Sequence, residues 1–177
     1  MQNKIILFIG GPGSGKTTVL NELCKMGYTC YPEISREITL EAQNAGINQL
    51  FLKNPLLFSE LLLKGRIQQH TNALNDTAKV VFIDRGIPDI IAYMNYVGQT
   101  PPAHFNAACE THIYSKVFIF PPWEEIYVND NERYEKFDQA KLIHNHLIAT
   151  YHKYGYKLLE VPKNILNLRV SFILKNL

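Results

Sequence analysis

The pattern of apolar and polar positions predicts strands and helices in alternation along the chain. The clearest apolar run is Ile5–Ile9, which is rich in β-branched residues and typical of a strand buried on both faces of a parallel sheet. Similar runs lie at Lys79–Ile83 and Lys116–Phe120, and weaker ones at Tyr28–Tyr31 and Lys157–Val161, between glycine and proline residues. The sequence therefore predicts five strands.

Apolar residues at helical spacing occupy the intervals between these runs. We predict helices at Lys16–Lys25, Ile34–Ala45, Pro55–Asn75, Pro88–Val97 and Asp138–Tyr154. Because strands separated by helices run parallel, this alternation predicts an α/β fold of three layers, with helices on both faces of the sheet. The stretch 98–115 is weakly periodic, so we expect a loop with a short helix there, which could help to form a substrate pocket.

Composition and charge restrict the class of protein. The 177 residues, 46% of them hydrophobic, fit one globular domain over residues 1–177. A formal net charge of +2 gives no general attraction to nucleic acid, and no apolar stretch approaches the roughly 18 residues of a membrane span. The three cysteines lack a Cys-x-x-Cys spacing. We therefore expect a cytoplasmic protein, monomeric or homodimeric, with small-molecule ligands.

A phosphate-binding motif directly follows the first strand. The sequence GGPGSGKT at residues 10–17 matches the pattern G-x-x-x-x-G-K-[ST] between a buried strand and a helix. Glycines there let backbone N–H groups surround phosphates, and we expect Lys16, solvated without ligand, to reach the β and γ phosphates, while Thr17 binds Mg²⁺. The predicted nucleotide-binding residues are Gly11, Pro12, Gly13, Ser14, Gly15, Lys16, Thr17 and Thr18.

Polar residues also follow the strand at 79–83. Ligands of a parallel sheet bind beyond the carboxyl ends of its strands, and this strand ends in Asp84 and Arg85. An acid in this position holds Mg²⁺ directly or through water, so Asp84 joins Thr17 as a candidate metal ligand. Arg85 is a candidate contact for a transferred or acceptor phosphate. The alternative for Asp84 is a cap for the helix that starts near Pro88.

The strand at 28–31 is followed by a second candidate group. Glu33 could accept the proton of an acceptor hydroxyl, and Arg36, three residues on, would share its helical face. The alternative is that Glu33 or Ser35 only caps the following helix.

A third group lies between the strand at 116–120 and the helix at 138–154. The polar segment around Arg133 is a candidate lid, near residues 124–137, that would bring a guanidinium to the γ phosphate. A solvated loop is the alternative. Trp123, on the same side, is either a packing residue or the wall of a base pocket.

Together these motifs resemble the nucleoside-kinase-like branch of phosphate-loop proteins, in the small AAA-domain group that includes the ribosylnicotinamide kinase domain of NadR. The resemblance is carried nearly end to end by GGPGSGKTTVLNEL, PEISREI, FIDRGIPDIIAY, PPWEEIYVNDNERYE and GYKLLEVP. It implies a phosphate-loop NTPase sheet in the order 2-3-1-4-5, ATP or GTP on the loop, an acceptor facing Glu33 and Asp84-Arg85, and Arg133 in a lid. The His-x-Gly-His signature of a nucleotidyltransferase is absent from the sequence.

Two functions remain open at this point. The first is a small-molecule kinase that moves the γ-phosphoryl group of ATP to a nucleoside-like or other hydroxyl acceptor with Mg²⁺. Its catalytic residues would be Lys16, Glu33, Asp84, Arg85 and Arg133, with Glu33, Arg36 and Arg85 binding the acceptor. The second is a regulatory ATPase or GTPase that hydrolyses slowly or switches without an acceptor.

Overall fold

The structure, a computed structural model, describes residues 3–127 and 136–177 of the chain. Its strands are β1 (Lys4–Ile9), β2 (Thr29–Tyr31), β3 (Val80–Asp84), β4 (Lys116–Ile119) and β5 (Leu158–Glu160). Its helices are α1 (Lys16–Lys25), α2 (Ser35–Asn44), α3 (Leu50–Lys53), α4 (Pro55–Leu74), α5 (Ile87–Tyr96), α6 (Ala103–Thr111), α7 (Phe137–Lys153) and α8 (Leu166–Lys175), with a 3-10 turn, η1 (Glu124–Ile126).

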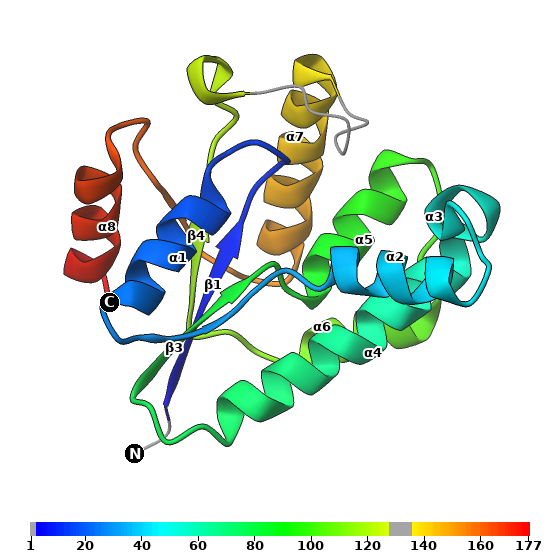
Figure 1. Ribbon diagram of the computed structural model, residues 1–177, viewed down its shortest axis with the longest axis horizontal. Helices are drawn as coiled ribbons and strands as arrows, with labels where there is room; N and C mark the ends of the chain where they lie inside the picture. Colours follow the sequence, from blue (N-terminus) through cyan, green and yellow to red (C-terminus); the bar gives the residue numbers. More distant parts are fainter. Residues whose placement is uncertain (1–2, 128–135) are drawn as a thin grey trace.

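The five strands form one parallel sheet in the order β2-β3-β1-β4-β5, which confirms the predicted fold and strand order. In the centre of the sheet, Phe8 of β1 lies opposite Asp84 of β3 on one side and Phe118 of β4 on the other. The carboxyl ends of these three strands therefore meet at one edge of the sheet, the upper edge in Figure 1. Ligand-binding groups that leave the strands there are brought together by the pairing itself.

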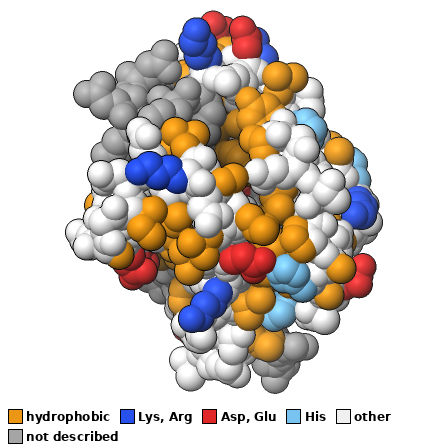
Figure 2. All heavy atoms as spheres, turned by 90° about the vertical axis from the view of Figure 1, so that its right-hand side faces the viewer, with side chains coloured by type: hydrophobic (Ala, Val, Ile, Leu, Met, Phe, Trp, Pro, Cys, Tyr) orange, Lys and Arg blue, Asp and Glu red, His pale blue; other side chains and the backbone are white. Residues whose placement is uncertain are grey.

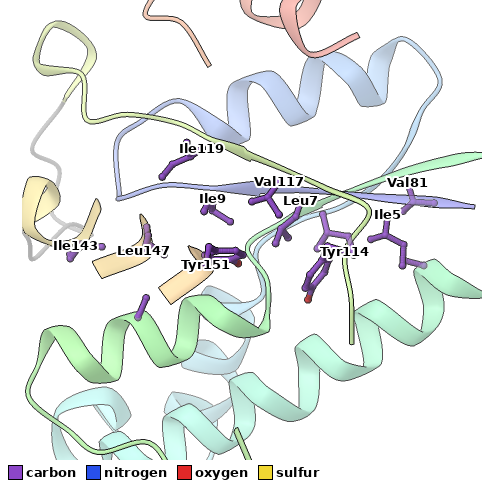
Figure 3. Close-up of a cluster of buried hydrophobic side chains, with 13 residues drawn as sticks. Ile5, Leu7, Ile9, Val81, Tyr114, Val117, Ile119, Ile143, Leu147 and Tyr151 are labelled. Carbon is purple, nitrogen blue, oxygen red and sulfur yellow. The ribbon is translucent and has the colours of Figure 1, made fainter. Parts of the chain in front are cut away.

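Alternate residues of β1 face the two helical layers. Ile6 and Phe8 pack toward α1 and α8, whereas Ile5, Leu7 and Ile9 pack toward α4, α5 and α7. Figure 1 shows these two groups of helices on opposite sides of the sheet, and Figure 3 shows the second cluster, with Ile5, Leu7 and Ile9 on the side where α7 lies. A strand buried on both faces explains why this run contains no polar position.

A further apolar cluster joins α2, α4, α5 and α6 beside the sheet. It includes Leu62 and Leu63 of α4, Ile87 of α5 and Phe105 of α6, with Ile34 packed against them at the start of α2. This cluster fixes the beginnings of α2 and α5 relative to the middle of α4. The residues that follow β2 and β3 are thus held against one long helix.

Two helices differ from the sequence prediction. The single turn α3 is too short to show a period, and α8 follows the last strand, where no helix was predicted. The short helix expected within 98–115 is confirmed as α6. The candidate lid near 124–137 falls largely on residues 128–135, with Arg133, outside the described residues. Across the residues that the structure describes, no helix combines the length and apolar character that a membrane span requires.

Candidate active site

The loop between β1 and α1 has the backbone that its glycines predict. Gly10, Gly13 and Gly15 all have positive φ values, of 150°, 71° and 80°. A side chain at Gly10 would also place its Cβ 2.5 Å from the carbonyl oxygen of Phe120. Glycine is needed at these positions because other residues would strain the loop or collide with the strand beside it.

Lys16 is folded into this loop. Its ammonium donates to the carbonyl oxygens of Gly10 and Gly11, at 3.0 and 2.9 Å, and to Ser14 Oγ at 3.3 Å, and the residue is only 6% exposed. The expectation that Lys16 is solvated without ligand is therefore wrong, because the loop carbonyls take the place of water. Burial, followed by the charge of Arg85, lowers the pKa of Lys16 to about 8.

Thr17 and Asp84 lie together where α1 begins and β3 ends. The Thr17 hydroxyl donates to Asp84 Oδ2 at 3.2 Å, and Asp84 is 2% exposed. Asp84 Oδ1 is buried and has no hydrogen-bond partner among the described residues. Burial raises the pKa of Asp84, against the opposing charge of Lys16. Two oxygens of the kind that Mg²⁺ prefers thus face each other beside the phosphate loop.

The interpretation of Asp84 as a helix cap is wrong. Helix α5 begins at Ile87, and the carboxylate that serves its first turn belongs to Asp89, whose Oδ2 accepts from the Gly86 N–H at 2.9 Å. Asp89 is fully buried and also accepts a hydrogen bond from the Tyr151 hydroxyl. The sequence analysis did not single out Asp89, although its position three residues after Gly86 is a capping signal.

Glu33 leaves β2 and points into the same region. Its Oε1 accepts from the backbone N–H groups of Ile34 and Ser35, both at 3.0 Å, so Glu33 does cap the start of α2. It also pairs with two arginines, Arg66 through Oε1 at 3.3 Å and Arg85 through Oε2. Burial acts to raise the pKa of Glu33, but the two guanidinium charges and the backbone bonds outweigh it and lower the pKa. The Glu33 carboxylate therefore both caps α2 and forms a charged cluster with Arg66 and Arg85.

Arg85 is held in place on several sides. Its Nε pairs with Glu33, its Nη1 lies 3.5 Å from Asp89 Oδ1, and its guanidinium lies 5.4 Å from the ring centroid of Tyr93. The residue has a positive φ of 68°, which is uncommon outside glycine and marks a constrained turn. The turn after β3 thus directs Arg85 toward Glu33 and not along the path of the strand.

A cavity of about 710 Å³ lies beside the phosphate loop. It is lined by residues 13–18, Trp123, Ile126, residues 164–166 and Arg169. Arg169 of α8 donates to the Ser14 carbonyl oxygen at 2.8 Å, and its guanidinium lies 5.0 Å and 5.5 Å from the ring centroids of Phe120 and Trp123. Trp123 is therefore a pocket wall, and the volume suits a nucleotide.

Besides Asp89, the sequence analysis also missed Arg66 and Arg169. Both are 4% exposed and both lie within helices, where an arginine in an apolar stretch looks like an ordinary surface position. Of the predicted residues, Lys16, Thr17, Glu33, Asp84 and Arg85 are brought together. Arg36 is exposed on the first turn of α2, and Arg133 lies outside the described residues.

The side of the molecule that carries α2, α3 and α4 is unusually apolar. Exposed hydrophobic side chains there are Leu40, Ile47, Leu52, Leu56, Leu57 and Leu61. Figure 2 views this side and shows hydrophobic side chains gathered around a hollow. Glu33 lies at the start of α2, one of the helices that carry this surface.

Comparisons with known proteins agree with the geometry. The sequence profile of a family described as AAA domain matches residues 5–169. No curated protein matches the sequence significantly.

Solved structures of two kinases and of the NadR protein share the fold. Deoxyadenosine kinase from M. mycoides, with products dCMP and dCDP, has a TM-score of 0.70 and 15% identity, with 97% of each chain covered. NadR protein in complex with NR has a TM-score of 0.75 and 17% identity, and the match covers 98% of this chain and 50% of that one. Thymidylate kinase from Ehrlichia chaffeensis has a TM-score of 0.67 and 16% identity, with 99% of each chain covered. At these identities, the likeness concerns the fold.

Proposed function

We propose that this chain, which belongs to the AAA-domain family, is a phosphotransferase. In this proposal it moves the γ-phosphoryl group of ATP to an uncharged, nucleoside-like compound that carries a hydroxyl group. The observation that carries this proposal is the Glu33 carboxylate, held by Arg66 and Arg85 beside the phosphate loop. A carboxylate oriented in this way can receive the hydroxyl group of an acceptor, whereas a protein that only switches would need it only to cap α2. Two of the structural neighbours are a deoxyadenosine kinase and a thymidylate kinase, which is consistent with the same type of reaction.

Glu33 suits the role of the group that accepts a proton from the acceptor. Its lowered pKa keeps it ionised at neutral pH, so it can receive a hydrogen bond from a hydroxyl. A carboxylate with a low pKa is a weak base, but the transition state of phosphoryl transfer is loose and needs little proton abstraction before the bond to phosphorus forms. In this proposal, Glu33 chiefly orients the hydroxyl and takes its proton late.

The charge balance around Glu33 favours an uncharged acceptor. Arg85 pairs with both Glu33 and Asp89, and Arg66 pairs with Glu33. A phosphate group on the acceptor would have to compete with these ion pairs for the guanidinium groups. The apolar side chains of α2 to α4 would instead favour the contact of a flat, uncharged ring.

On the nucleotide side, the loop N–H groups and Lys16 would bind the phosphates, and Trp123 and Ile126 would contact the base. The oxygens of Thr17 and Asp84, with the unpartnered Asp84 Oδ1, fit a Mg²⁺ ion bound with the nucleotide. Such an ion would offset negative charge on the phosphates.

The experiment is a screen for phosphorylated product with ATP, Mg²⁺ and pairs of acceptors, each nucleoside beside its 5′-monophosphate. With the best acceptor and saturating ATP, we expect Glu33→Gln to lower product formation by about 10²–10⁴-fold, because the acceptor loses its carboxylate partner. Binding of ATP should change little. The matched control is Glu37→Gln, which removes an exposed carboxylate from the same first turn of α2 and should leave the rate unchanged.

Three results would count against all or part of the proposal. A parent protein with no acceptor-dependent turnover across the panel would favour the alternative of a nucleotide-dependent switch. A Glu33→Gln variant as fast as the parent would show that the acceptor does not use this carboxylate. Faster turnover of the monophosphates would contradict only the uncharged acceptor.

A further inference from the structure

Arg66 is a buried cation in the middle of a long helix. It lies on α4, is 4% exposed, and is surrounded by the apolar cluster that joins α2, α4 and α5. Burial of a guanidinium is costly unless the charge is paired and its N–H groups are bonded. The partners of Arg66 therefore indicate what this position is for.

Among the described residues, the guanidinium makes two hydrogen bonds, one to the segment after β2 and one to the turn after β3. Its Nη2 donates to Glu33 Oε1 at 3.3 Å, and its Nη1 donates to the Gly86 carbonyl oxygen at 2.8 Å. Gly86 directly follows Arg85, which pairs with the other carboxylate oxygen of Glu33. Arg66 thus connects Glu33, after β2, to the turn after β3, and the planar fork of arginine can hold both at once.

The contact with Glu33 is not needed to cap α2. Glu33 Oε1 already accepts from two backbone N–H groups at the start of that helix. Without Arg66, the helix start would keep its cap, but the carboxylate would lose one of its two cations and its link to the Gly86 carbonyl. What Arg66 adds is therefore charge and orientation.

We propose that Arg66 is a positioning residue, which holds the Glu33 carboxylate against the Arg85 turn in the orientation that receives the acceptor hydroxyl. This inference rests on the proposed phosphotransferase function and assigns a role to a residue outside the predicted motifs. Arg66 touches Glu33 and the Gly86 backbone, and its effect on the reaction would pass through Glu33.

Other charged groups also act near Glu33 and must be considered in any measurement of its ionisation. Arg85 pairs with it directly, and the charges of Lys16 and Asp84 interact with it from the phosphate loop and the end of β3. Asp89 acts on Arg66 and Arg85 from α5. Removal of Arg66 leaves all of these in place, so a change in Glu33 would report the loss of Arg66 itself.

The test compares Arg66→Met with Gln69→Met in the full chain. Gln69 lies one turn further along α4, is 9% exposed, and donates to the Pro32 carbonyl oxygen at 2.8 Å. Each change removes a buried hydrogen bond from α4 to the Pro32–Glu33 segment, but only Arg66→Met also removes a charge and the bond to the Gly86 carbonyl oxygen. The first readout is the pKa of Glu33 from carboxyl NMR, assigned by the signal lost in Glu33→Gln, without nucleotide or Mg²⁺.

We expect Arg66→Met to raise the pKa of Glu33 by about 1 unit or more, because the carboxylate loses a neighbouring cation. Gln69→Met should leave this pKa within about 0.3 units of the parent value. Arg66→Lys should keep the pKa of Glu33 close to the parent value, because it keeps the positive charge. With an acceptor, Arg66→Met should lower kcat about tenfold or more and leave the KM for ATP unchanged. Equal shifts in the two Met variants, or no shift in either, would overturn the positioning role.

Two provisions keep the outcome decisive. If Arg66→Met does not fold, Arg66→Gln takes its place, because it keeps a hydrogen-bonding side chain at this position while the charge is absent. The pKa readout needs no acceptor. A parent without acceptor turnover would therefore count against the proposed function, whereas an unmoved Glu33 pKa would count against the role of Arg66.

Discussion

The Lys16 side chain is hydrogen-bonded within the protein when no ligand is bound, and it can still exchange these bonds for bonds to a phosphate. Its ammonium donates to two carbonyl oxygens and one hydroxyl of the loop that would receive phosphate. These are neutral acceptors, so the buried charge is hydrogen-bonded but not neutralised. An anionic phosphate is a stronger partner, because burial and the charge of Arg85 lower the pKa of Lys16 to about 8 despite these neutral acceptors.

This lowered pKa predicts how nucleotide affinity depends on pH. The free protein loses the Lys16 proton above about pH 8, whereas bound phosphates favour the ammonium and raise the pKa of the complex. Between the two pKa values, binding takes up a proton, so affinity falls as pH rises, by up to about tenfold per pH unit. Below pH 8, affinity should be flat. Calorimetric titration with a non-hydrolysable ATP analogue, from about pH 7 to about pH 9.5, measures this slope.

The control for this slope is Lys16→Met. This variant should bind the analogue more weakly at every pH and show no decline above pH 8, because the titrating group is gone. A decline that persists in Lys16→Met would assign the pH dependence to another group.

Regular elements were predictable where the chain repeats a clear pattern. Each of the five strands is an apolar run closed by a turn residue, and the sheet that they form has the expected order. Helix α8 was missed although Leu166, Val170 and Ile173 have helical spacing, because apolar and polar residues alternate over 166–172, a period of two that is typical of a strand. Turn α3, with four residues, is shorter than any usable period.

The candidate site was predictable only where function depends on the local sequence. The phosphate loop and the acids after β2 and β3 follow from motif and strand position, because parallel pairing brings strand ends together. Arg66 and Arg169 reach the site from helices far away in sequence, and only tertiary packing determines which face of a helix turns inward. The burial of Lys16 likewise depends on the folded loop.

Helix α8 supports the nucleotide pocket through Arg169, and this predicts a specific loss. Arg169→Met removes the bond to the Ser14 carbonyl oxygen and the cation that lies against Phe120 and Trp123. A hydrogen bond from a charged group contributes about 1.5–3 kcal/mol, so we expect the Kd of the ATP analogue to rise about tenfold or more. Calorimetry at pH 7 measures the change.

The matched control is Lys175→Met. It removes an exposed cation from the other end of α8 and should leave the Kd unchanged. Equal weakening in both variants would mean that α8 acts through its overall charge and not through the Arg169 contact.

At the scale of the whole molecule, the proposed sites for the nucleotide and the acceptor lie on different sides of the carboxyl edge of the sheet. The loop, the exit of β4 and the start of α8 line the nucleotide cavity, whereas α2 to α5 surround Glu33 and the apolar side. Both sides meet at Asp84 and Lys16 in the centre of the sheet. Each ligand should therefore slow amide hydrogen exchange in the elements that line its own site.

Amide hydrogen exchange tests this division. With the ATP analogue and Mg²⁺ at about 100 times Kd, global stability rises by about 2.7 kcal/mol, which slows the exchange of the most buried amides everywhere. Amides that exchange by local opening respond only where the ligand binds. We expect added protection at residues 10–18, 120–126 and 164–169, and none in α2 or α3, which have few buried residues. Addition of an accepted nucleoside should then protect α2 and α4. Protection of α2 and α3 by the ATP analogue alone would contradict a separate acceptor side.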